Sequence, residues 1–231
     1  METVAGYIYG GVCMRERPIL FNTEMVQAIL DGRKTCTRRV VKGYIPKDAE
    51  FGYTAFTPKG AISCRGIFET NYPGYGEKFF ELPYHRGDIL YVRETWCSAY
   101  DGEKFFYLAD KLTNREERLL LNYDDVKWHP SIHMPKEAAR IWLKVTEVRM
   151  ERLQDITEDG AKEEGANCKN GKNVGLEEKM RRTAIERFAE IWNGTIKKSA
   201  LDRYGWSVNP WVWVIEFERC EKPGKEQKRN E

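Results

Sequence analysis

The sequence reads Gly32-Arg33-Lys34-Thr35-Cys36-Thr37-Arg38-Arg39 where a predicted helix ends and a predicted strand begins. Upstream, Asn22 or Thr23 can cap a helix whose apolar residues recur at helical spacing, and Gly32 stands where a glycine commonly ends one. Those apolar residues are Met25, Val26, Ile29 and Leu30. Downstream, the β-branched composition of residues 35–41 favours a strand.

Alternation along this strand divides the motif between two faces. One face is expected to carry Thr35, Thr37 and Arg39, and the other Cys36, Arg38 and Val40. A lysine at the helix exit, with a threonine and an arginine that point the same way, can line one pocket. A solvated basic turn explains the same composition more simply.

The spacing Gly32-x-Lys34-x4-Arg39 resembles the signature of the ASCH domain, a member of the PUA-like β-barrel superfamily associated with RNA and modified nucleosides. The order of predicted elements is similar too. Three further stretches resemble phage and prophage members of this group: Arg17–Asn22, Val92–Trp96 and Pro130–Pro135. The resemblance implies an α+β fold, a PUA-like (ASCH) mixed β-barrel with flanking helices and hairpin or loop insertions.

This resemblance covers most of residues 17–220 and sets the expected domain organisation. Residues 1–16 are expected to form an N-terminal extension that is not ordered, and the charged residues 221–231 a disordered tail. Between them lies one ASCH domain. Its insertions are expected at about 43–85, 97–135 and 166–205.

Bulk properties exclude several classes of protein. The net charge of +2 gives no protein-wide basic field, so any contact with nucleic acid must be local. Six cysteines without a CxxC pair, and three histidines, argue against a zinc site and a disulfide scaffold, and we expect no metal or cofactor. Without a secretory signal or a transmembrane run, the chain is expected in the cytoplasm, that of a bacterial host if a phage or prophage encodes it.

Patterning along the rest of the chain predicts further elements. Strands are expected over residues 17–21, 61–69, 89–96, 104–109, 139–153 and 211–217. Thr157 can cap a short helix over 158–164 that Gly165 ends. A second helix ends at Gly194 and carries an apolar stripe, interpreted as core packing: Leu176, Met180, Ala184, Phe188 and Trp192.

Three residues outside the motif are candidate contacts. Glu94 is expected to share a strand face with apolar residues, so its carboxylate needs a partner such as Arg39 or Lys34, unless it lies at a rim in water. Trp96 offers a flat surface on which a base can stack. His133 lies in the stretch that resembles the family, which suggests a substrate contact, although a structural histidine fits as well.

The resemblance also implies a chemistry. One branch of the ASCH family consists of small amidohydrolases that remove the acetyl group of N4-acetylcytidine with a Lys, Thr and Glu constellation. Matched through the motif, these residues fall on Lys34, Thr37 and Glu164. In this hypothesis Thr37 attacks the amide or orients water, Lys34 accepts the proton, Glu164 assists proton transfer or activates water, and Arg39 orients the substrate or oxyanion.

Other functions stay open at this point. A non-catalytic module can recognise a modified base or single-stranded RNA in the same pocket, and an open groove that continues past Arg33 and Arg38 would favour a polymer. RNA cleavage by the same groups ranks third, and a structural role in a phage particle fourth. The chain is about twice as long as the small amidohydrolases. The sequence does not indicate an oligomeric state.

Overall fold

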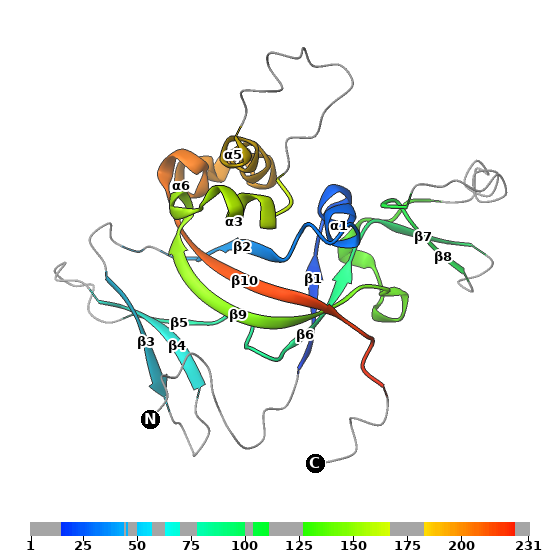
Figure 1. The fold of residues 1–231 in the computed structure, drawn as a ribbon, viewed down its shortest axis with the longest axis horizontal. Coiled ribbons are helices and arrows are strands. Elements are labelled where there is room, and N and C mark those ends of the chain that lie inside the picture. The colour runs from blue at the N-terminus through cyan, green and yellow to red at the C-terminus, as the bar shows by residue number, and fades with distance from the viewer. Residues whose placement is uncertain are drawn as a thin grey trace, which may run out of the picture.

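A mixed five-stranded sheet forms the centre of the fold (Figure 1). The computed structural model describes residues 15–43, 45, 50–56, 63–69, 78–99, 104–110, 127–166 and 183–224. The strands in sheet order are β1 (Glu16–Leu20), β6 (Ile89–Arg93), β9 (Trp142–Arg152), β10 (Trp211–Cys220) and β2 (Cys36–Val40). The pair β1 and β6 is parallel and the other pairs are antiparallel. The expected α+β class is therefore confirmed.

Strand β10 lies between β9 and β2 in this sheet. It pairs with β9 along its whole length, with a register shift between Glu216 and Phe217, and with β2 on its other side. Trp213 and Ile215 pack into a core that includes residues of the first helix, while Val212 and Val214 pack into a second core beneath the later helices. Both faces of its first half are thus buried, as the continuous apolar run predicts.

Two smaller sheets fall at or next to the expected insertions. A meander of β3 (Glu50–Phe56), β4 (Ser63–Glu69) and β5 (Lys78–Glu81) falls in 43–85, and the hairpin of β7 (Trp96–Ala99) and β8 (Lys104–Tyr107) begins one residue before 97–135. The single strand expected over 89–96 is wrong. It divides between β6 and β7 because the Glu94 backbone N–H donates to Met134 Sδ (3.2 Å) instead of continuing the sheet.

Four α-helices lie among the described residues: α1 (Thr23–Leu30), α3 (Glu158–Glu163), α5 (Ala184–Thr195) and α6 (Leu201–Tyr204). Short 3₁₀ turns are η3 (Ser131–His133), η4 (Lys136–Ala138), η5 (Leu153–Asp155), η6 (Lys198–Ala200) and η7 (Trp206–Val208). Asn22 and Thr157 cap α1 and α3 as expected, each accepting a backbone N–H with its side-chain oxygen. Figure 1 shows α3, α5 and α6 grouped beside β2, with α1 next to them.

The ends of the chain and one expected helix are covered only in part. Strand β1 begins at Glu16, inside the predicted extension, while residues 1–14 and 225–231 lie outside the described residues. The first half of the helix predicted from its apolar stripe, with Leu176 and Met180, also lies outside them. In the described parts of the chain, no helix combines the length and apolar character needed to cross a bilayer.

A close contact between α1 and the end of α3 fixes the motif in space. Gly165 follows α3 with φ +88°, and a Cβ there would lie 2.8 Å from the Cβ of Ala28. The Lys34 backbone N–H donates to the Ala28 carbonyl (3.0 Å), and the Thr35 N–H donates to the Glu163 carbonyl (2.9 Å). The segment after α1 is thereby held against the segment after α3.

We expect Gly165→Ala to lower the free energy of unfolding by about 2 to 4 kcal/mol, because it adds a clash with Ala28 to the cost of left-handed backbone. Gly32→Ala is the matched control, since Gly32 also has a positive φ (+71°) but no atom within 4 Å of its added Cβ. It should cost about 1 to 2 kcal/mol. Urea denaturation measures both, and equal losses would contradict the close-contact argument.

Candidate functional site

A buried ion pair joins the segment after α1 to the residue that follows α3. Lys34 Nζ lies 2.6 Å from Oε2 of Glu164 and also donates to the Glu164 backbone carbonyl at 2.9 Å. The Lys34 side chain is 0% exposed and that of Glu164 is 4% exposed. The structure therefore brings together two of the three residues of the predicted constellation, from segments 130 residues apart.

Arg38 extends this pair into a cluster of two cations and two carboxylates. Its Nη1 lies 3.4 Å from Oε1 of Glu164, while its Nε and Nη2 donate to Oε1 of Glu151 at 2.8 and 2.7 Å. Glu151 comes from β9, two strands away from β2. Because each buried charge has an opposite partner, the cost of removing these groups from water is partly offset.

Burial and charge shift the pKa values of this cluster in different directions. Burial lowers the pKa of Lys34, against the opposing effect of Glu164. For Arg38 burial also acts to lower the pKa, but Glu164 and Glu151 outweigh it and raise the pKa. Burial, followed by Glu164, raises the pKa of the Cys36 thiol to about 12. Lys34 can therefore release a proton more easily than an ordinary lysine, whereas Cys36 is a poor nucleophile.

Thr37 lies on the other face of β2 from Arg38. Its hydroxyl accepts a hydrogen bond from Arg39 Nη1 at 2.6 Å and its residue is fully buried. Phe21 lies near both neighbouring cations, with its ring centroid 5.5 Å from Lys34 Nζ and 5.4 Å from Arg39 Cζ. Within the described residues, Thr37 makes no hydrogen bond to Lys34 or Glu164.

A cavity of about 430 Å³ opens beside the ion pair, between β2, the start of α1 and α5. Its ionisable lining residues are Arg38, Arg39, Lys42 and Glu164, and its aromatic ones are Phe188 and Trp192. Volumes of this order are typical of sites for small molecules. Glu164 is thus the member of the Lys34–Glu164 pair that reaches the cavity.

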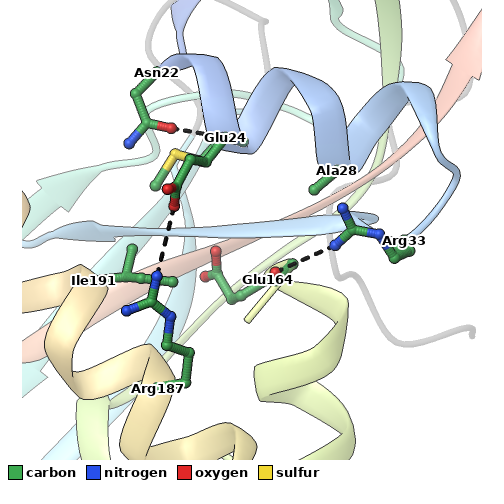
Figure 2. A pocket seen from close by; sticks show the side chains of 9 residues that line it. Asn22, Glu24, Ala28, Arg33, Glu164, Arg187 and Ile191 are labelled. Atoms are coloured by element: carbon green, nitrogen blue, oxygen red, sulfur yellow. Dashed lines mark hydrogen bonds and ion pairs between the residues drawn. The ribbon is translucent and has the colours of Figure 1, made fainter. Parts of the chain in front are cut away.

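A smaller hollow adjoins this cavity and shares Glu164 with it. Figure 2 shows Glu164 between α1 and α5, with Arg33 on one side. Arg187 of α5 lies 3.8 Å from Glu24 of α1, so an exposed ion pair links the two helices across the hollow. Arg33 is held by Asp31 (2.9 Å) and by the Gly165 carbonyl (3.4 Å).

The apolar stripe of α5 has a second role beyond packing. Phe188 and Trp192 are buried in the core beneath α5, as predicted, but both also line the cavity. The Phe188 ring centroid lies 5.8 Å from Arg38 Cζ. Sequence reasoning missed these two residues as part of the cavity wall, and it missed Lys42, although alternation from Arg38 through Val40 points to it.

Glu94 belongs to a different cluster. Its carboxylate accepts two hydrogen bonds from Arg140, at 2.9 and 3.0 Å, and Arg140 also donates to Asp110 at 2.7 Å. Arg39 and Lys34 are not its partners, so that expectation was wrong, and at 1% exposure Glu94 is not a rim residue either. Burial raises the pKa of Glu94, opposed by Arg140. Arg140 lies after the predicted loop 127–135, and nothing in the sequence marks it as the partner of Glu94.

Trp96 and His133 lie away from the cavity. The Trp96 ring contacts those of His129 and Phe105, with centroids 5.1 and 5.7 Å apart. His133 is exposed in η3, and neither it nor Trp96 is among the residues that line the cavity. Their expected contacts with a ligand therefore have no geometric support from this cavity.

The described residues contain no group of three His, Cys, Asp or Glu side chains that could hold a metal ion. Comparisons with known proteins add nothing to the site. No family model, curated protein or solved structure matches this chain. What the site can do is therefore argued from its own residues.

Removal of both partners of the buried pair should cost less than the two single removals added together. We expect Lys34→Met to lower the free energy of unfolding by about 3 kcal/mol, because Glu164 keeps a buried charge with only a longer contact to Arg38. Lys34→Met combined with Glu164→Gln should cost less than the sum of the single changes. Lys162→Met is the control. It breaks the exposed ion pair with Asp159 in α3 and should change the free energy of unfolding little. Additive losses in urea denaturation would contradict the coupling.

The Cys36 thiol should resist alkylation in the native protein. With a pKa of about 12 against an ordinary value of 9.0, its thiolate fraction at pH 8 is about a thousandfold lower. Iodoacetamide labelling read by peptide mass spectrometry should rise with pH, and Glu164→Gln should increase the rate. Native labelling as fast as in urea would show that the thiol is not enclosed.

Proposed function

We propose that this chain is an ASCH-type protein of the PUA-like superfamily and that its cavity binds a modified pyrimidine nucleoside and hydrolyses an N4-acetyl amide. The order of elements around the Gly32-x-Lys34-x4-Arg39 motif supports the family. The observation that carries the chemistry is the buried Lys34–Glu164 pair, whose carboxylate reaches a cavity lined by cations and aromatic rings.

In this proposal the pair acts as the base. Burial lowers the pKa of Lys34, and its Nζ donates to Oε2 of Glu164 at 2.6 Å, which orients the carboxylate. Glu164, which reaches the cavity, takes a proton from water, and the resulting hydroxide adds to the acetyl carbonyl. The tetrahedral intermediate then collapses, and the proton passes from Glu164 to the leaving amine. The products are the free nucleoside and acetic acid, which loses its proton to the solvent and leaves as acetate.

The guanidinium groups of Arg38 and Arg39 supply the positive charge that this step needs. Both line the cavity beside Glu164, where they can donate to the oxyanion of the tetrahedral intermediate. Thr37 is fully buried and accepts a hydrogen bond from Arg39, so we assign it the positioning of Arg39 rather than nucleophilic attack. Phe188 and Trp192 provide flat surfaces against which a base can pack.

The second candidate is recognition of a modified nucleoside or RNA without chemistry. The enclosure of the catalytic candidates favours it, because the Lys34 side chain is 0% exposed and Thr37 is fully buried. Arg38 is also neutralised by two carboxylates. In a binding module the same cluster would hold the walls of the cavity in place.

Purified protein incubated with N4-acetylcytidine should release cytidine and acetate, measured by liquid chromatography. Glu164→Gln should lower kcat by about 100- to 10,000-fold, the range typical of a lost general base. Lys162→Met removes an exposed lysine of α3, the helix that ends just before Glu164, and should retain full activity. Binding without turnover between pH 6 and 9 would select the second candidate. Full activity in Glu164→Gln would overturn the assignment of the base.

A further inference from the structure

Lys42 follows β2 in the cavity wall, and its charge has no opposite partner among the described residues. It is exposed, lines the cavity, and has no ion pair or hydrogen bond within the parts of the chain that the structure describes. Arg38, Val40 and Lys42 alternate along β2 and its extension and all line the cavity, whereas Val41 between them is buried in the opposite core. The strand thus directs the Lys42 side chain toward the same space as Arg38.

The cavity wall as a whole carries an excess of positive charge. Its ionisable residues are three cations and one carboxylate, Glu164. Arg38 is matched by carboxylates, but Arg39 donates to the Thr37 hydroxyl and to the carbonyls of Arg38 and Leu20, with no carboxylate within ion-pair distance among the described residues. A ligand that carries negative charge is therefore favoured in this space.

Lys42 and Arg38, which contacts Glu164, lie four residues apart on one stretch of extended chain in the cavity wall. The Val41 backbone N–H still donates to the Trp211 carbonyl (3.0 Å), so the chain stays extended beyond β2. Four residues of extended chain separate the Cα atoms of Arg38 and Lys42 by about 13 Å. A pyrimidine nucleotide carries its exocyclic nitrogen at one end and its phosphate at the other, so it can present one group to each end.

We propose that Lys42 binds the phosphate of a pyrimidine nucleotide, and that the cavity takes the phosphorylated form in preference to the free nucleoside. The ammonium group is a point charge with three donors, which suits phosphate oxygens. This assignment rests on the proposed function for the class of ligand and for the orientation of its base toward Glu164. It does not require that hydrolysis occurs.

Isothermal titration calorimetry with cytidine 5′-monophosphate, cytidine and inorganic phosphate tests the assignment. The wild-type protein should bind the monophosphate about tenfold more tightly than cytidine, the gain of one charge-assisted contact. Lys42→Met should remove this preference and leave the affinity for cytidine unchanged. Inorganic phosphate should bind more weakly than the monophosphate. Lys144→Met, which removes an exposed lysine of β9 outside the cavity lining, should behave as the wild type.

The assignment is wrong if the monophosphate binds no more tightly than cytidine, including the case in which neither binds. It is equally wrong if the preference survives in Lys42→Met, or if inorganic phosphate binds as tightly as the nucleotide. Hydrolysis of N4-acetylcytidine without a preference for the monophosphate would remove the role of Lys42 alone. A preference that depends on Lys42, without hydrolysis, would remove the proposed chemistry alone.

Discussion

The ion pair between Lys34 and Glu164 is the interaction on which the rest of the site depends. It connects the exit of α1 to the end of α3 across 130 residues of chain, and neither side chain is in contact with bulk water to any appreciable extent. Two ions removed from water in this way are stable only when further partners compensate them. Arg38 and the Glu164 carbonyl provide that compensation, and the tight approach of Gly165 to Ala28 holds the two segments at the required distance.

The side chains of β2 alternate between two faces, and each face contacts different residues. The face with Arg38 meets the carboxylates and the aromatic residues of α5, while the Thr37 hydroxyl on the other face holds Arg39. Both arginines nevertheless reach the cavity, since β2 lies at the end of the five-stranded sheet as described and the Arg39 side chain extends to the Leu20 carbonyl. The positive charges of Arg38 and Arg39 therefore both reach the cavity, although the two side chains leave opposite faces of β2.

Local features were predictable from the sequence, and contacts between distant segments largely were not. The caps at Asn22 and Thr157 and the strand after Gly32 follow from residue types within a few positions, so their prediction is confirmed. The partner of Glu94 depends on how the chain from β6 meets residue 140, which periodicity does not encode. The pairing of Glu151 with Arg38 was equally unpredictable, because it arises from the register of β9, β10 and β2. The meeting of Lys34 and Glu164 was reached only through family resemblance.

Lys34 has two anchors on the same residue, and they differ in kind. One is the Glu164 carboxylate and the other is the Glu164 main-chain oxygen, which every amino acid would provide at this position. Exchange of the acid for a neutral side chain therefore removes the ion pair, while the contact of Lys34 with the main-chain oxygen can remain. The residue type at position 164 therefore sets the charge beside the cavity, while the backbone fixes where the ammonium group of Lys34 lies.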